Sequence, residues 1–153
     1  MLPGPASNDA LGWSVAISAD GLTAVAGAIG QGSGTGAVYV FTRSGPGWLR
    51  AAELTASDAV TGDDFGYSVA ISAGSVLVGA NLKNSVRGAA YVFTGHGPAW
   101  HQAAELTASD GAIGDFFGSS VAISAAGRTA LIGAYGHAAV AGAAYVFAGL
   151  PPR

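Results

Sequence analysis

The chain has 153 residues and half of them are hydrophobic, so it is long enough to form one domain with a hydrophobic core. Only 10% of the residues are charged, whereas 25 are glycine, which is typical of tight turns and close packing. The net charge of −3 gives no basic surface for nucleic acid or an anionic membrane, and the absence of cysteine excludes disulfides and thiolate metal sites.

The N-terminal residues do not have the pattern of a signal peptide. Its first residues, MLPGPASND, have neither a basic n-region nor an apolar h-region, so no signal peptide is expected in this chain. The most apolar run, residues 138–150, is shorter than the roughly 20 residues of a membrane-spanning helix. We therefore expect neither nucleic acid nor a membrane as a partner, and the compartment stays undetermined.

One pattern occurs three times along the chain. Residues 9–41 contain DALGWSVAIS, TAVAGA and GAVYVF, and closely similar segments lie within residues 63–93 and 115–147. The glycine before each SVAIS falls at Gly12, Gly66 and Gly118, a period of about 50 residues that is typical of propellers and solenoids. A fourth element, W-x-x-A-A-E-L-T-A-S-D, occurs twice, at residues 48–58 and 100–110.

Each element has the length and patterning of a strand. In the first, Trp13, Val15 and Ile17 alternate with small residues, so we expect Trp13 in the core. The second elements, such as Thr23 to Ala28, are almost continuously apolar, which predicts strands buried on both faces. The third carry Tyr and Phe, which favour strands. No segment shows a sustained helical period, so no helix is predicted.

Four antiparallel strands per repeat are typical of a β-propeller blade, with the first strand near the central channel and the Trp-containing fourth outside. The pattern FG-x-SVAIS, LVGA, GAAYVF and W-x-x-x-AELTASD resembles the FG-GAP repeat family, which forms the blades of integrin α-subunits and of many bacterial surface or secreted proteins. The resemblance covers residues 9–148 and implies an all-β propeller and an extracellular or cell-surface location. The calcium-binding members carry several acidic ligands between strands one and two, where this chain has only Asp20, so we expect no metal and no cofactor.

The strand count leaves the third repeat without its outer strand, because Pro151 and Pro152 cannot pair as a central strand. A single-chain propeller typically needs four to eight blades to close. We therefore expect three blades to close a ring by homo-oligomerisation, a six-bladed homodimer being the simplest solution, with a larger ring or a fragment of a longer array left open. Within a single segment of residues 1–153, the expected bounds are 9–58 for blade 1, 63–110 for blade 2 and 115–148 for the incomplete blade 3.

Five aspartates fall at repeated positions. Two interpretations are open: each carboxylate accepts hydrogen bonds from its own turn, or together they form rim carboxylates that bind a cation or a polyol. By contrast, His96, His101 and His137 lie at unrelated positions of the repeat, so they give only weak support for a metal site. The aspartates are Asp9, Asp63 and Asp115 at one position and Asp58 and Asp110 at another.

Ligand recognition is expected in the connections between the second and third strands, because these vary in sequence around a constant scaffold. The segment Asn81 to Arg87 supplies Asn81, Lys83 and Arg87 as candidate binding residues. Trp48 and Trp100 could stack against a sugar, or each could pack over the edge of a blade. The corresponding segments of the other repeats are Ile29 to Thr35 and Tyr135 to Ala141.

No set of charged and nucleophilic residues converges on a catalytic pattern, so an enzyme is not predicted. Glu53 and Glu105 recur in both complete outer strands, which suits a surface contact better than a catalytic pair of carboxylates in different environments. The leading hypothesis is a non-catalytic scaffold or binding module that self-assembles into a ring and recognises protein or glycan. The alternative is a purely structural, self-assembling repeat fragment, natural or engineered, that binds no ligand.

Overall fold

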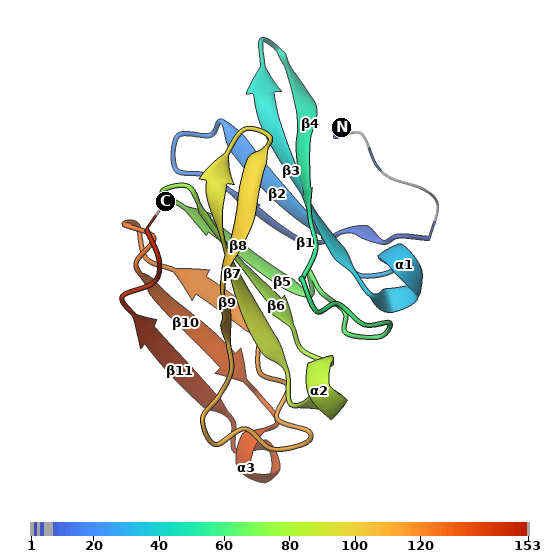
Figure 1. The fold of residues 1–153 in the computed structure, drawn as a ribbon, viewed down its shortest axis with the longest axis vertical. Coiled ribbons are helices and arrows are strands. Elements are labelled where there is room, and N and C mark those ends of the chain that lie inside the picture. The colour runs from blue at the N-terminus through green and yellow to red at the C-terminus, as the bar shows by residue number, and fades with distance from the viewer. Residues whose placement is uncertain (1, 3, 5–7, 153) are drawn as a thin grey trace.

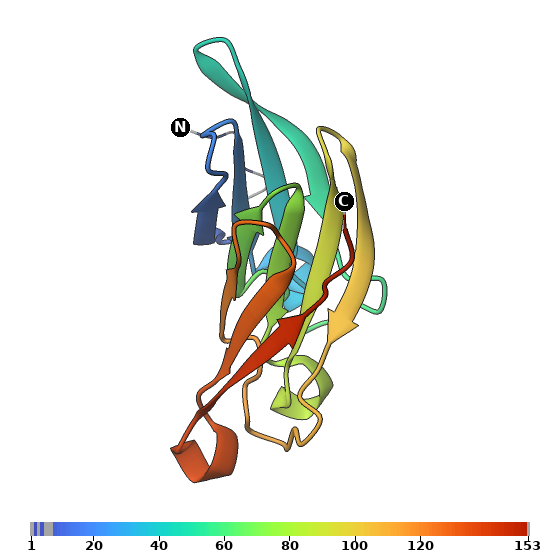
Figure 2. The same cartoon turned by 90° about the vertical axis from the view of Figure 1, so that its left-hand side faces the viewer.

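The computed structural model describes residues 2, 4 and 8–152 of the chain. These residues form three antiparallel sheets, which lie side by side in chain order in Figure 1 and are seen from the side in Figure 2. The all-β fold predicted from the repeats is confirmed. No helix of the described residues is long and apolar enough to cross a membrane.

Each sheet corresponds to one repeat, and we call the sheets blades 1, 2 and 3. Blade 3 has three strands within the described residues, whereas blades 1 and 2 have four. The strands of blade 1 are β1 (Leu11–Ile17), β2 (Thr23–Ala28), β3 (Ala37–Ser44) and β4 (Gly47–Leu54). Those of blade 2 are β5 (Ser68–Ser72), β6 (Ser75–Ala80), β7 (Ala89–His96) and β8 (Ala99–Leu106). Those of blade 3 are β9 (Ser120–Ile123), β10 (Thr129–Ala134) and β11 (Ala143–Ala148).

Consecutive strands within a blade are antiparallel neighbours joined by turns. Between β5 and β6 the turn consists of Ala73 and Gly74, which both have positive φ, as a two-residue hairpin requires. In each complete blade, the pairing of the third strand with the outer strand shifts register at the same place. The shift follows Val40 of β3 in blade 1 and Val92 of β7 in blade 2. The repeated bulge shows that the two sequence copies fold with the same local geometry.

The hydrophobic core lies between the blades. One cluster combines Val25, Val38 and Val40 of blade 1 with Phe65 and Tyr91 of blade 2. A second cluster makes the same junction between blades 2 and 3, with Phe117 in the position of Phe65. Both phenylalanines are fully buried and pack edge-on or tilted against aromatic side chains of their own blade. The FG motif therefore works as an apolar wedge between successive blades.

Backbone contacts fix the distance between blades. Phe65 donates its N–H to the Thr35 carbonyl at 3.1 Å, and Phe117 donates to the Arg87 carbonyl at 2.9 Å. Gly79 sits so close to the next blade that an added Cβ would lie 1.9 Å from the Gly118 carbonyl oxygen. The glycine of the GA motif is therefore required for close packing, since any side chain would push the blades apart.

Two expectations from the sequence were wrong in detail. Each connection between the second and third strands contains one helical turn, although no helix was predicted: α1 (Gln31–Gly34), α2 (Lys83–Val86) and α3 (His137–Val140). Trp13, expected in the core, is 54% exposed, because no blade within the described residues covers that side of β1. Its ring still contacts the Tyr67 ring, with centroids 5.7 Å apart.

Candidate functional site

A buried lysine is bound by two aspartates at the edge of blade 2 that carries α2. Lys83, only 3% exposed, places its Nζ 3.0 Å from Asp63 Oδ2 and 3.1 Å from Asp58 Oδ2. It also donates to the Asp58 carbonyl oxygen at 3.0 Å. Tyr91 of β7 donates its hydroxyl to Asp58 Oδ1 at 2.9 Å. The cluster thus ties the segment that leaves blade 1 to the loop and third strand of blade 2.

The charges of this cluster stabilise one another. Burial opposes the charge of Lys83, but hydrogen bonds to Asp63 and Asp58 outweigh burial and raise the lysine pKa. Burial likewise opposes the charge of Asp58, and the bonds from Lys83 and Tyr91 lower its pKa overall. Burial and the Asp58 hydrogen bond raise the pKa of Tyr91, so its hydroxyl stays protonated. The ammonium of Lys83 and the carboxylate of Asp58 therefore favour each other's charged forms.

Blade 3 repeats the cluster with a histidine in the position of the lysine. The Nδ1 atom of His137 is 3.0 Å from Asp115 Oδ2, and its Nε2 atom is 3.8 Å from Asp110 Oδ2. Tyr145 donates its hydroxyl to Asp110 Oδ1 at 2.8 Å, as Tyr91 does to Asp58. The hydrogen bond to Asp115 raises the pKa of His137, while burial and the Asp110 hydrogen bond raise the pKa of Tyr145 to about 12.

The carboxylates at the first repeated position also fix their own turns. Asp63 Oδ2 accepts the Val60 N–H at 2.8 Å, and Asp115 Oδ2 accepts the Ala112 N–H at 2.8 Å. Asp9, at the same position of blade 1, accepts the Gly30 N–H with its backbone carbonyl at 3.0 Å. In the part of the chain that the structure describes, no group of three or more acidic or histidine side chains is placed to hold a metal ion.

Sequence reasoning missed that Lys83 and His137 are equivalent. Both residues begin the helical turn of their connection, five residues before the glycine that precedes the third strand. Counting back from Gly88 and Gly142 would have placed them together, and the same count puts Gln31 in blade 1. Blade 1 instead has Arg50 above the ring of Tyr39, 4.2 Å from its centroid, and paired with Glu53.

The two repeated tryptophans lie at the edges of blades. Trp48 packs against the core cluster of blade 1, and Trp100 packs against the cluster between blades 1 and 2 and donates its Nε1–H to the Gly97 carbonyl at 2.9 Å. Each ring is half-buried. Asn81 is buried next to α2, and its Oδ1 atom has no hydrogen-bond partner among the described residues.

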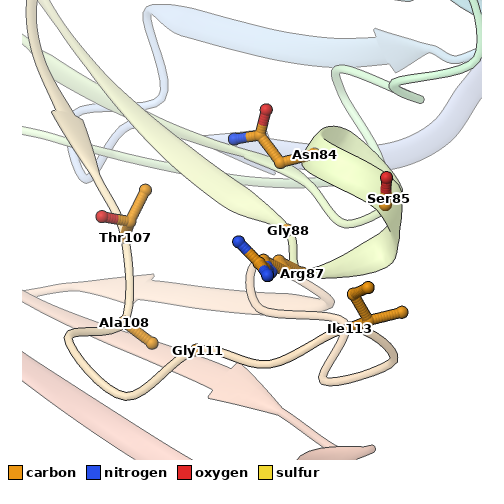
Figure 3. Close-up of a pocket in the computed structure, with 8 residues that line it drawn as sticks. All are labelled: Asn84, Ser85, Arg87, Gly88, Thr107, Ala108, Gly111 and Ile113. Atoms are coloured by element: carbon orange, nitrogen blue, oxygen red, sulfur yellow. The ribbon is translucent and has the colours of Figure 1, made fainter.

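An open cavity of about 520 Å³ lies beside α2, as Figure 3 shows. Asn84, Ser85 and Arg87 line it from the α2 connection, and Thr107 and Ile113 line it from the segment that leads to blade 3. Arg87 is exposed, and no carboxylate of the described residues pairs with it. Of the candidate ligand residues, Arg87 is therefore the one whose charge faces solvent at a cavity, whereas Asn81 and Lys83 are buried.

The fold and its clusters define a segment of β-propeller-like blades joined by apolar wedges and, from blade 2 onward, by ion pairs. The model of the FG-GAP repeat matches residues 3–41, 48–93 and 100–147. The matches cover most of the sequence, so the chain belongs to the FG-GAP repeat family, as its motifs predict. Among curated proteins, no sequence shows a significant match.

Proposed function

We propose that this chain is a non-catalytic β-propeller scaffold and binding module, which closes its ring by self-association and recognises protein or glycan through the connections that carry α1, α2 and α3. The observation that carries the proposal is that these three connections share one unusual backbone but differ in side chains. All three lie along the same edge of the blades (Figure 1). Variable side chains on a constant backbone are the usual arrangement of a recognition surface.

The shared backbone is a left-handed turn. Its central residues have φ values between 49° and 60° and ψ values between 37° and 55° in all three connections. L-residues adopt this region at a cost of roughly 1–2 kcal/mol each, and conformations of this kind cluster at functional sites. The central pairs are Gly32 and Ser33 in α1, Asn84 and Ser85 in α2, and Ala138 and Ala139 in α3.

The chemistry of the cavity beside α2 suits a polar ligand. An amide, two hydroxyls and a guanidinium, from Asn84, Ser85, Thr107 and Arg87, offer both hydrogen-bond donors and acceptors around an apolar contact from Ile113. Sugar hydroxyls and the backbone of an extended peptide both present this mixture of donors and acceptors. Protein or glycan is therefore the ligand class that we propose.

Binding to a glycan array and to a panel of extracellular proteins tests the recognition. We expect Arg87→Ala to weaken any ligand found by about 10-fold or more, since hydrogen bonds to a charged group contribute about 1.5–3 kcal/mol. Arg128→Ala removes the same charge from an exposed position of blade 3, away from the cavity lining, and is the matched control. Equal loss in both variants, or no ligand in either panel, would contradict recognition at this cavity.

Variants of Trp48 and Trp100 need a second measurement. Both rings pack against core clusters, so Trp48→Ala and Trp100→Ala are expected to lower the melting temperature whether or not the rings contact a ligand. Stacking on a sugar is supported only if binding falls at temperatures where the variant remains folded. A binding loss that follows the unfolded fraction identifies both residues as packing residues.

The purely structural alternative also has an observation in its favour. Four of the five repeated aspartates, together with Lys83 and His137, are engaged in contacts within the protein. Few charged groups therefore remain for a ligand, as expected of a module whose only activity is assembly. The glycan array and the protein panel distinguish the two proposals, because the structural one predicts self-association with no ligand.

A further inference from the structure

We infer that two copies of this chain join through a copy of the protein's own inter-blade junction, in which blade 3 of one copy packs on blade 1 of the other. This inference rests on the self-association proposed above and adds the faces and the residues. The two internal junctions show which contacts each side of a blade makes with its neighbour.

The internal junctions share a set of hydrogen bonds. Ser14 of blade 1 donates its hydroxyl to the Gly66 carbonyl at 2.7 Å, and Ser68 of blade 2 donates to the Gly118 carbonyl at 2.7 Å. Each junction also has one parallel bridge, between Gly36 and Phe65 or between Gly88 and Phe117. Each blade therefore presents a serine hydroxyl and a backbone carbonyl to the blade that follows. The FG loop of the following blade bonds to both groups.

We call the side of a blade that faces the following blade its trailing face. In blades 1 and 2 this face is completely covered: Val40 and Val92 are fully buried, as are Val25 and Leu77. The equivalent residues of blade 3 are Val146, which is 68% exposed, and Leu131, which is 46% exposed. The equivalent serine, Ser120, is exposed as well. Blade 3 thus keeps the residues of a trailing face but has no blade against it in the described structure.

The opposite side, which faces the preceding blade, is the leading face. Val69 of blade 2 is buried there in the cluster between blades 1 and 2, and Val121 of blade 3 packs in the next cluster. Their equivalent in blade 1, Val15, is 69% exposed, and its neighbours Trp13 and Ile17 are exposed too. On β3 of blade 1, by contrast, Tyr39 and Phe41 are already buried, with Leu2 packed against their cluster. One molecule therefore carries one uncovered trailing face and a leading face that is uncovered along β1.

These two faces are complementary because they continue the series of internal junctions. A second copy supplies Leu11 and Gly12 in the places of Phe65 and Gly66, so its Gly12 carbonyl accepts the Ser120 hydroxyl and its Leu11 takes the place of the phenylalanine wedge. Gly133 lies in the position of Gly27 and Gly79, the residues whose missing side chain permits the close approach. A two-fold axis along the channel makes both junctions at once and gives six blades.

The test measures molecular mass by light scattering and sedimentation for the full chain and for variants of each face. Val146→Lys places a charge on the trailing face and Val15→Lys places one on the leading face, and we expect each alone to give monomers. Ile113→Lys, at a comparably exposed residue outside both faces, is the matched control and should keep the mass of the unmodified chain. Ser120→Ala should raise the dissociation constant by roughly 5-fold or more, and Ser109→Ala should leave it unchanged.

The outcomes separate this inference from the function on which it rests. If the unmodified chain has the mass of a monomer at micromolar concentration, both self-association and this junction are wrong. An oligomer that Val146→Lys dissociates and Val15→Lys does not would mean that two trailing faces meet, so the junction inferred here would be wrong while self-association stands. A mixture of the two lysine variants should give a heterodimer held by one junction, because one copy still offers an intact trailing face and the other an intact leading face. Its second junction carries both lysines, so this heterodimer should dissociate more readily than the unmodified dimer.

Discussion

Position 83 and its equivalent in blade 3 show how one substitution changes the chemistry of a repeated site. Lys83 keeps its charge across the physiological range, because its hydrogen bonds to the aspartates outweigh burial. His137 occupies the same place, yet its proton is lost within a range that proteins encounter. The two clusters have the same hydrogen-bonded tyrosine and aspartates, so the difference between them can be tested one residue at a time.

Removing the buried ammonium should destabilise the protein strongly. Lys83→Met leaves the buried carboxylate of Asp63 without its partner, and loss of one member of a buried ion pair costs about 3 kcal/mol or more. Chemical unfolding of the variant measures this cost. Arg43→Met, which removes an exposed arginine, is the control and should change the free energy of unfolding by less than about 0.5 kcal/mol. Equal effects would show that the Lys83 cluster adds nothing beyond net charge.

The histidine cluster should make stability depend on pH. Because the folded pKa of His137 is raised above its unfolded value, its contribution is fully present below about pH 6.5 and is lost as the pH rises through the folded pKa. The lowered pKa of Asp115 gives a contribution that is present above its unfolded pKa and is lost in more acidic solution.

Melting temperatures between pH 5 and 9 check this behaviour. We expect the unmodified chain to lose stability from slightly acidic toward alkaline pH, and His137→Lys, which copies blade 2, to remove that loss. His101→Lys is the control, because His101 lies in the outer strand β8, away from both aspartates. If His137→Lys keeps the alkaline decline, another group is responsible for it.

At the scale of the element, the left-handed turns combine a repeated geometry with residues that do not favour it. Blade 1 has Gly34 at the last position of the turn, whereas blades 2 and 3 have valines with φ values of 67° and 74°. A β-branched residue in this region is strained by contact between its side chain and the backbone. The connections of blades 2 and 3 are therefore less stable locally than that of blade 1.

Relieving this strain should stabilise blade 3. Val140 is well exposed, so Val140→Gly loses little packing and should raise the free energy of unfolding by up to about 1 kcal/mol. Val60→Gly is the matched control: this valine is also exposed but does not have positive φ, and its replacement should lower stability. A lower melting temperature for Val140→Gly would mean that the turn is not strained.

The strands were predictable from the sequence, whereas the left-handed turns between the second and third strands were not. Alternation in SVAIS, the apolar run of LVGA and the aromatic YVF each match one strand, because side-chain burial on a sheet is read directly in the order of residues. The turn at Ala138 and Ala139 has no such signal, since alanine favours right-handed helix and adopts the left-handed region here only because the flanking strands and Gly142 hold the ends.

The candidate site divides in the same way. That aspartates bind their own turns follows from a local tendency of the residue, so it could be stated from the sequence. That Lys83 reaches back to Asp58 depends on how two blades pack, and no local pattern contains that distance. The exposure of Trp13 likewise depends on which neighbour covers β1 and not on the strand in which it lies.

At the scale of the whole molecule, the proposed self-association would couple stability to assembly, because the core is built between blades. Each internal junction buries a phenylalanine wedge, and three blades in one chain make two such junctions. Closing a six-bladed ring would add two more without any new type of contact. In a closed ring, the free energy of unfolding would include that of dissociation.

The melting temperature should therefore rise with protein concentration. For a folded dimer that melts to unfolded monomers, each 10-fold increase in concentration stabilises the dimer by about 1.4 kcal/mol, which for a pair of chains of this size corresponds to roughly 2 °C. Calorimetry over a 100-fold range of concentration measures the slope. Val146→Lys should give a lower melting temperature that does not depend on concentration, because its trailing face can no longer pack, whereas Ile113→Lys should keep the slope. A flat profile for the unmodified chain would show that its three blades melt alone, with the residues of blade 3 exposed as they are in the single chain.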